Sequence, residues 1–250
     1  MNNISENLSV MAQTADACER SWSLGAHETE ERVLFFCETS VKAAEQIARA
    51  AQSLGITDSL LADWSTAIPG ADAIGLALRC DRQSVRLYTQ YWTMIGAHVK
   101  RGNRSPFPLY RGFKSLPGGV VRSDDYLAIP MAPPEVFWPR MAEGFAAFDL
   151  DTEQAQDVFR DLDAGNAIFT VTSGEGRKSW LTTVRRADID RAEVADWLAP
   201  LAARPLGDDI ITAARTTDLV HVAGGQDAVK GDFLTFYFES DPESVLARLR

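Results

Sequence analysis

The stretch from Ala73 to Trp92, AIGLALRC-DRQ-SVRLYTQYW, contains the unit from which this chain is built. Two runs of strand-forming residues flank a short polar turn. In the second run, apolar side chains alternate with polar or aromatic ones, which is typical of a strand whose two faces meet different environments. Three more copies follow, at residues 109–129, 167–186 and 219–239. The sequence therefore predicts four antiparallel hairpins.

Helical segments separate most of these hairpins. We expect helices over residues 4–24, 40–54, 57–68, 133–148, 152–162, 190–201 and 208–215 and from residue 242 onward, and a short buried strand over 32–38. Residues 96–108, GAHVKRGNRSPFP, are predicted to form a polar loop, either a functional lid or a plain connection. Helices recurring between antiparallel hairpins indicate an α+β fold, with one sheet, open or closed into a barrel, and helices on one face. No linker rich in Pro, Gly or Ser divides residues 1–250, so we expect a single domain.

Composition narrows the range of partners. The formal net charge is −10, the chain has no Lys/Arg run, and a phosphate-backbone binder needs a basic face, so nucleic acid is not expected as a partner. The three cysteines have no metal-ligand spacing, which fits a reducing compartment. The N-terminus has no secretory signal pattern and no run is long enough to span a membrane. We expect a soluble, cytoplasmic protein that binds no membrane.

Alternation also separates two faces on the predicted strands. Val85, Leu87 and Thr89 share one face of their strand, and the opposite face carries larger polar and aromatic groups. Across the chain, the non-core faces carry Arg86, Tyr88, Gln90, Trp92, Arg122, Asp124, Tyr126 and Tyr237. Tyrosine, tryptophan and arginine in this pattern suit a lined cavity for a planar or anionic ligand. The alternative is an exposed sheet on which arginines stack on tyrosines.

Familiar catalytic motifs are not found. Ser173 to Ser179, SGEGRKS, lacks the spacing of a phosphate-binding loop and is predicted to be a hairpin turn. The three histidines show no metal-ligand spacing, so no metal site is predicted. His221 falls on a non-core face, either as a catalytic group or as a hydrogen-bonded structural residue. Glu38 shares a strand face with Leu34 and Phe36.

The repeated hairpin–helix unit resembles the αββα (ABBA) barrel of the aromatic prenyltransferases. The resemblance rests on three segments: Ser84-Val85-Arg86-Leu87-Tyr88, Leu109-Tyr110-Arg111-Gly112-Phe113-Lys114, and Gly225-Gln226-Asp227 leading to Phe236-Tyr237-Phe238. In that family, basic residues inside the barrel hold a prenyl diphosphate, tyrosines shield an allyl cation, and a carboxylate orients the aromatic acceptor.

The resemblance implies roles for particular residues. Diphosphate contacts would come from Arg86 and Lys114, and Glu38 would be the carboxylate. Other residues expected to line the substrate site are Tyr88, Trp92, Arg122, Tyr126 and Tyr237. Fixed positive charge stabilises a leaving diphosphate, and aromatic faces stabilise an allyl cation. No cofactor is implied, apart from magnesium accompanying the diphosphate.

Three functions remain open at this point, and whether the protein is an enzyme is one of the open questions. The first is a transferase that moves a prenyl or similar diphosphate-activated group onto a small aromatic acceptor in the barrel lumen. The second is a non-catalytic protein that binds a small molecule or a protein partner, which the scarcity of histidine favours. The third is a cofactor-free isomerase or lyase of a biosynthetic pathway, with Glu38 and His221 as its acid–base pair.

Overall fold

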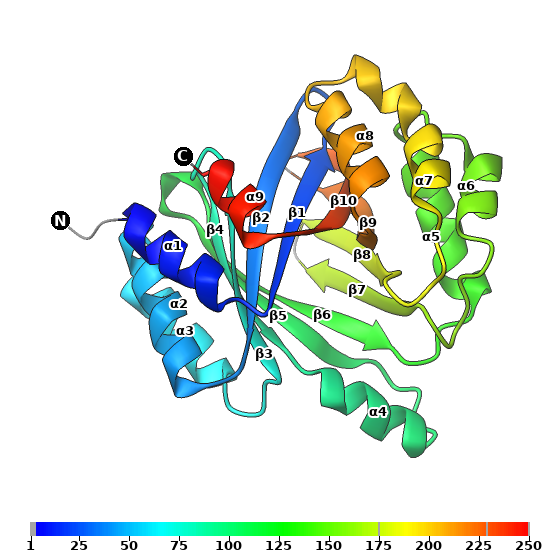
Figure 1. Ribbon diagram of the computed structural model, residues 1–250. Helices are drawn as coiled ribbons and strands as arrows, with labels where there is room; N and C mark the ends of the chain where they lie inside the picture. Colours follow the sequence, from blue (N-terminus) through cyan, green and yellow to red (C-terminus); the bar gives the residue numbers. More distant parts are fainter. Residues whose placement is uncertain (1–3, 175, 229, 250) are drawn as a thin grey trace.

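The computed structural model describes residues 4–174, 176–228 and 230–249, and its strands form one closed antiparallel barrel (Figure 1). Around the barrel the strands follow the order β1-β10-β9-β8-β7-β6-β5-β4-β3-β2. Their bounds are β1 Ala17–Leu24, β2 Thr29–Glu38, β3 Ala73–Arg79, β4 Val85–Gln90, β5 Phe107–Ser115, β6 Val121–Ile129, β7 Ile168–Gly174, β8 Arg177–Thr183, β9 Leu219–Asp227 and β10 Gly231–Ser240. The expectation of an α+β fold built on antiparallel hairpins is confirmed, and the sheet is closed.

Helices follow the strand pairs along the chain. They are α1 Ile4–Thr14, α2 Val41–Ser53, α3 Asp58–Ala67, α4 Trp92–Lys100, α5 Pro134–Ala146, α6 Thr152–Val158, α7 Arg191–Trp197, α8 Gly207–Thr216 and α9 Pro242–Ala247. Ser40 and Thr57 begin α2 and α3, and their side chains accept hydrogen bonds from the backbone N–H groups of Ala43 and Leu60. Such caps satisfy donors that a helix leaves without internal partners.

Glu175 and Val229, at two of the predicted hairpin turns, lie outside the described residues.

The predicted helix over residues 4–24 is wrong in its second half. The helix ends at Thr14, and Ala17–Leu24 forms β1, which pairs with β2 on one side and β10 on the other. Cys18 and Trp22 are four residues apart, a spacing that fits a helix and a strand equally well. Strand β1 closes the barrel and completes a fifth hairpin.

The predicted loop over residues 96–108 is also largely wrong. Helix α4 continues through Lys100 and β5 begins at Phe107. Trp92, expected on the inner face of a strand, is the first residue of α4, and its ring meets that of Tyr110 edge to face with centroids 5.4 Å apart. Helix α4 thus separates two hairpins that the sequence placed next to each other, and it projects away from the other helices (Figure 1).

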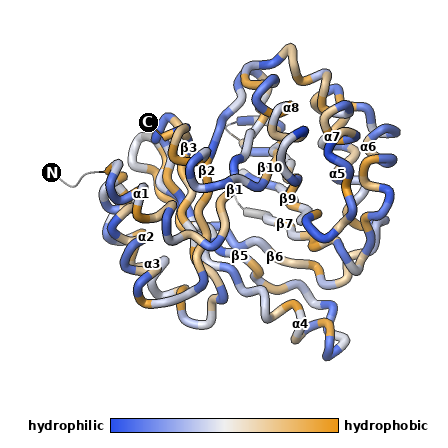
Figure 2. Tube along the Cα trace, in the orientation of Figure 1, coloured by the Kyte–Doolittle hydropathy of each residue, from blue (hydrophilic) through white to orange (hydrophobic). Residues whose placement is uncertain are grey.

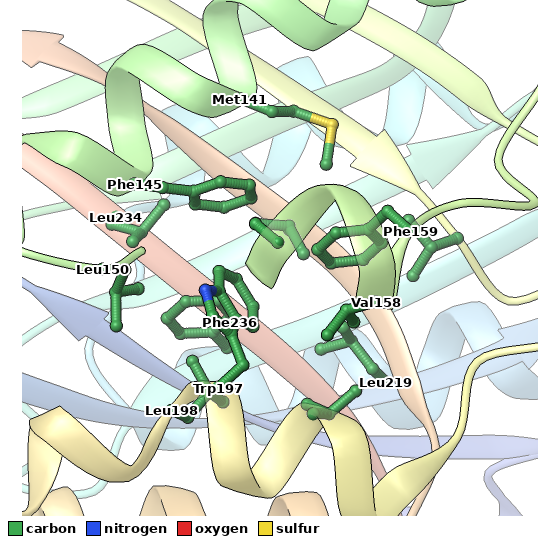
Figure 3. Close-up of a cluster of buried hydrophobic side chains, with 14 of the residues drawn as sticks. Met141, Phe145, Leu150, Val158, Phe159, Trp197, Leu198, Leu219, Leu234 and Phe236 are labelled. Atoms are coloured by element: carbon green, nitrogen blue, oxygen red, sulfur yellow. The ribbon is translucent and has the colours of Figure 1, made fainter. Parts of the chain in front are cut away.

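The helices and the barrel wall enclose two main hydrophobic cores on the outside of the barrel. One lies under α1–α3 and α9, and the other lies under α5–α8. In the second core, Trp197 contacts Phe145 and Phe236 with ring centroids 4.8 and 5.8 Å apart (Figure 3). Apolar residues alternate with polar ones along the strands (Figure 2), because one strand face meets these helices and the other faces the lumen.

One stretch of the barrel wall is incompletely paired. Strands β6 and β7 pair only at Leu127–Val171, Ala128–Thr170 and Ile129–Phe169. Among the described residues, 121–126 of β6 pair with β5, and the register of β6 with β7 includes none of them. The two strands therefore separate toward their hairpin turns, as Figure 1 shows.

Candidate functional site

Strand β4 shows how the sequence forms a polar lumen. Its residues alternate between buried and partly buried. Val85 and Leu87 belong to the core under α1–α3, so Arg86 and Tyr88 point to the inside of the barrel. This is the face assignment that alternation predicted.

A cavity of about 740 Å³ lies inside the barrel. Residues of the hairpin turns line it, among them Gly25–Glu28 between β1 and β2 and Leu116 and Val120 between β5 and β6. In a barrel of consecutive hairpins these turns share one end, so the cavity opens at that end. Seven basic side chains line it: Arg32, Arg79, Arg86, Lys114, Arg122, Arg177 and Lys230. The lumen is therefore basic although the whole chain is acidic.

Three of the cations converge on one carboxylate near the mouth. Glu30 forms ion pairs with Arg32, Arg79 and Lys230, and its distance to Arg79 is 2.7 Å. Burial alone would raise the pKa of the Glu30 carboxyl, but the charges of Arg32 and Lys230 lower it to about 2. Glu30 stays ionised at neutral pH and keeps three long side chains on the cavity wall.

A second carboxylate organises the opposite wall. Asp124 on β6 forms ion pairs with Lys114 on β5 and with Arg122, the latter at 2.7 Å. Burial, together with the nearby charges of Arg86 and Arg177, lowers the pKa of the Lys114 ammonium to about 7. The protonation state of Lys114 therefore depends on its surroundings. An anion in the cavity would favour its charged, protonated form.

Arg86 differs from its neighbours. Its buried Nε atom has no hydrogen-bond partner in the described parts of the chain, and the neighbours that raise the pKa of its guanidinium against burial are tyrosines, Tyr88 first, and not a carboxylate. A guanidinium keeps its charge in proteins, and a buried charge without a carboxylate is costly. Arg86 is thus the side chain in this cavity that is best placed to receive an anionic ligand.

Aromatic rings lie beside the basic groups. Tyr88 and Tyr126 have ring centroids 6.5 Å apart, and Lys114 Nζ lies 5.8 Å from the Tyr126 centroid. Tyr126 and Tyr237 also line the cavity. Gly112 on β5 makes room for two of these rings, because a Cβ atom there would lie 3.1 Å from Tyr88 and 3.3 Å from Tyr126.

Glu19 on β1 and His221 on β9 share the lumen-facing strand sides of Ser23 and Ala223, which line the cavity. Glu19 and His221 themselves are not among the residues that line the 740 Å³ cavity. Glu19 Oε1 lies 3.6 Å from His221 Nε2, and His221 Nδ1 lies 2.9 Å from the hydroxyl of Thr183. The other oxygen of Glu19 is buried and has no hydrogen-bond partner among the described residues. Along β1, Glu19 is two residues from Ser21, which pairs with Tyr237. The Glu19–His221 pair can accept a proton or an N–H hydrogen bond in a water-poor space.

The structure brings most of the predicted site residues together. Arg86, Lys114, Arg122, Tyr126 and Tyr237 line one cavity, and Tyr88 packs beside them. Trp92 lies outside the cavity lining, in α4. Glu38 is exposed at the end of β2, and the structure pairs His221 with Glu19 instead.

Several lumen residues were missed by sequence reasoning. Glu19 was placed in a helix, and Arg32 and Arg177 were not considered. A signal for Glu19 exists, since Glu19, Ser21 and Ser23 alternate with a face that is apolar apart from Arg20, namely Cys18, Trp22 and Leu24. That alternation is typical of a strand with one apolar and one polar face.

Within the described ranges, no three His, Cys, Asp or Glu side chains are grouped so that they could hold a metal ion. Across the same residues, no helix is long and apolar enough to cross a membrane.

Comparison with known proteins places the fold. A 5-dimethylallyltryptophan synthase from Streptomyces coelicolor matches with a TM-score of 0.59 and 16% identity over 95% of this chain and 87% of its own. A 6-dimethylallyltryptophan synthase from Micromonospora olivasterospora, solved with DMASPP and Trp, matches with a TM-score of 0.58 and 15% identity over 93% of this chain and 85% of its own. The prenyltransferase PriB, solved with L-tryptophan and dimethylallyl thiolodiphosphate, matches with a TM-score of 0.54 and 16% identity over 90% and 80%.

These matches concern structure. No family model matches the sequence, and no curated protein matches it. The protein has the αββα barrel fold of the aromatic prenyltransferases, and the resemblance stated from the sequence is confirmed at the level of the fold.

Proposed function

We propose that this protein transfers a prenyl group from a prenyl diphosphate to an aromatic acceptor inside the barrel lumen. The observation that carries the proposal is the convergence of basic side chains and tyrosines on one cavity. Two of the matching structures are named dimethylallyltryptophan synthases, and the prenyltransferase PriB was solved with L-tryptophan and dimethylallyl thiolodiphosphate. Tryptophan-like acceptors are therefore the first to test.

The diphosphate would lie against Arg86 and Lys114. Arg86 has a charge that no carboxylate in the described residues neutralises, and Lys114 gains a proton readily when an anion approaches. When the bond between the prenyl carbon and the diphosphate oxygen breaks, the electron pair leaves with the diphosphate. Fixed positive charge in a low-dielectric site stabilises that leaving group.

The prenyl cation would lie among the tyrosines. The rings of Tyr88 and Tyr126 face the lumen next to the basic groups, and Tyr237 lies on the cavity wall. Aromatic faces attract a cation, and they exclude the water that would otherwise trap it as an alcohol.

The acceptor would be deprotonated by the Glu19–His221 pair. The aromatic ring forms a carbon–carbon bond to the prenyl cation, and the ring carbon then loses its proton to restore aromaticity. Glu19 can take this proton, since one of its oxygens is buried without a partner and the other is near His221. General-base assistance of this type contributes about 10²–10⁴-fold to rates.

Titration calorimetry with dimethylallyl thiolodiphosphate and with pyrophosphate, each with and without magnesium, tests the donor site. Saturable binding in which the prenyl analogue exceeds pyrophosphate supports a site with both basic and aromatic parts. No heat at millimolar concentrations of either ligand would argue against the proposal. That result would favour the alternative that this protein binds a different ligand or a protein partner.

A further inference from the structure

One segment of the sequence has a charge opposite to that of the chain as a whole. Residues 82–123 contain eight lysines and arginines and no aspartate or glutamate, although the chain has a formal net charge of −10. Some of these cations line the lumen cavity and belong to the proposed donor site. Three others, Lys100, Arg101 and Arg104, lie outside the barrel, at the end of α4 and on its connection to β5. We refer to these three residues as the α4 basic surface.

The α4 basic surface is open to solvent, and its charges have no internal partners. Its three side chains are exposed, and the part of the chain that the structure describes gives none of them an ion pair or a side-chain hydrogen bond. Two apolar side chains of the same helix, Met94 and Val99, are 37% and 41% exposed. Methionine and arginine are enriched at protein interfaces. The exposed side of α4 is therefore suited to contact an anionic protein surface.

The same chain carries a surface of the opposite charge. Residues 149–163, which include α6, contain six aspartates and glutamates, all exposed, and a single arginine. Among them, Glu153, Asp157 and Asp161 form no ion pair with another described residue. The arginine, Arg160, forms its ion pair with Glu193 on α7 at 2.8 Å. Glu153 and Asp157 are four positions apart, so they lie on one side of α6. We refer to Glu153, Asp157 and Asp161 as the α6 acidic surface.

The two surfaces cannot pair within one molecule. Helix α4 lies between β4 and β5, whereas α6 lies between β6 and β7 and packs against α5 and α7. Figure 1 shows α4 projecting at one end of the molecule and α6 at a distant edge. Each molecule therefore presents two complementary charged surfaces on different sides, and the partner that satisfies either of them is another molecule.

We propose that the α4 basic surface docks on the α6 acidic surface of a second copy of this chain. The contact joins unlike surfaces, so each pair leaves one basic and one acidic surface free, and further copies can add head to tail. A lipid or nucleic-acid surface is a poorer partner, because its phosphates would repel the acidic remainder of the molecule. This proposal does not depend on prenyl transfer.

Analytical ultracentrifugation of the full chain at two ionic strengths tests the proposal. At about 0.1 M salt the Debye length is about 10 Å, so contacting charges still attract while the repulsion between whole molecules is screened; at about 1 M it is about 3 Å. We expect the weight-average mass to rise with protein concentration past that of two chains at the lower ionic strength, and to stay at that of one chain at the higher. Protein concentrations up to about 1 mM are needed, because exposed ion pairs are individually weak.

Charge reversals identify the surfaces. Lys100→Glu/Arg101→Glu has two acidic surfaces and should remain monomeric at the lower ionic strength. Lys42→Glu/Arg49→Glu, on the exposed side of α2, changes the net charge by the same amount and should associate as the wild type does.

Glu153→Lys/Asp157→Lys has two basic surfaces and should also remain monomeric alone. An equal mixture of this variant with Lys100→Glu/Arg101→Glu should associate again, because each molecule then meets a surface of opposite charge. Recovery in the mixture also shows that both variants are folded.

Three results would overturn the proposal. They are a wild type that is monomeric at both ionic strengths, equal loss of association in the α2 and α4 variants, and no recovery in the mixture. Co-sedimentation of a monomeric wild type with phosphatidylserine vesicles would assign the α4 basic surface to lipid instead. None of these results bears on whether the lumen binds dimethylallyl thiolodiphosphate, so the proposed function is tested separately.

Discussion

Lys114 on β5 and Asp124 on β6 form an ion pair across two neighbouring strands, and both side chains are buried inside the barrel. Asp124 also holds Arg122, so one carboxylate positions two of the basic groups that line the cavity. Basic residues that must receive an anion are repelled by each other when the anion is absent. Carboxylates within the cluster lower that repulsion and keep the fold intact before the ligand binds.

The depressed pKa of Lys114 predicts how binding depends on pH. With a pKa of about 7, the ammonium is charged below pH 7 and increasingly neutral above it. Pyrophosphate affinity should therefore fall between pH 7 and 9 by up to roughly tenfold per unit, with proton uptake on binding. Calorimetry in buffers of different ionisation enthalpy measures that uptake.

Lys114→Arg is the control, because its charge does not titrate in this range and the ligand's own ionisation is unchanged. The same pH dependence in both proteins would rule out Lys114 as its source.

Arg86→Ala should weaken binding without harming the fold. The substitution removes a charge that contacts tyrosines and no carboxylate among the described residues, so the free energy of unfolding should change little. Because charge-assisted hydrogen bonds contribute about 1.5–3 kcal/mol, affinity for the thiolodiphosphate should drop by about 10- to 100-fold. Arg49→Ala, on the exposed surface of α2, is the matched control. Unfolding of Arg86→Ala would mean that Arg86 supports the fold.

Glu19→Gln should separate binding from turnover. The amide cannot accept the acceptor's proton at neutral pH, so we expect turnover to fall by about 10²- to 10⁴-fold. Affinity for pyrophosphate should change little. Glu38→Gln is the comparison, since Glu38 is exposed at the end of β2. A large loss of turnover in Glu38→Gln with none in Glu19→Gln would restore the role that the sequence alone assigned to Glu38.

Two glycines of the lumen should respond differently to a methyl group. A Cβ at Gly75 would lie 2.5 Å from the Phe36 ring and 2.9 Å from the Phe35 carbonyl oxygen. Gly75→Ala should therefore destabilise the fold by about 1–3 kcal/mol in chemical denaturation.

At Gly112 the nearest atoms belong to the rings of Tyr88 and Tyr126, at 3.1 and 3.3 Å. Gly112→Ala should displace these rings and weaken thiolodiphosphate binding, with a smaller loss of stability than Gly75→Ala. Equal binding by Gly112→Ala and the wild type would show that the tyrosines do not contact the donor.

Much of the fold was accessible from local sequence signals. Alternation in Val85–Gln90 predicted which side chains face the lumen, and Pro117-Gly118-Gly119 marked a hairpin turn that the structure contains. Both signals are local, because strand alternation and turn chemistry depend on neighbouring residues. Arg86, Lys114 and Tyr126 lie on the strand faces that point into the closed barrel, and for this reason they line one cavity.

What could not be predicted depends on long-range contacts. Strand β1 exists because β2 and β10 lie on either side of it, and the pairing of Glu19 with His221 joins β1 to β9. The ion pair between Lys230 and Glu30 joins residues 200 positions apart. The incomplete pairing of β6 with β7 leaves no trace in either strand's own pattern.

The most direct measurement incubates the protein with dimethylallyl diphosphate and a tryptophan-containing acceptor and follows the products by mass spectrometry. We expect one pyrophosphate released for each acceptor that gains one dimethylallyl group, and a lower yield of both products in Arg86→Ala at a donor concentration that just saturates the wild type. Pyrophosphate release that yields only the prenyl alcohol, or no reaction with a donor that binds tightly, would contradict prenyl transfer in this barrel.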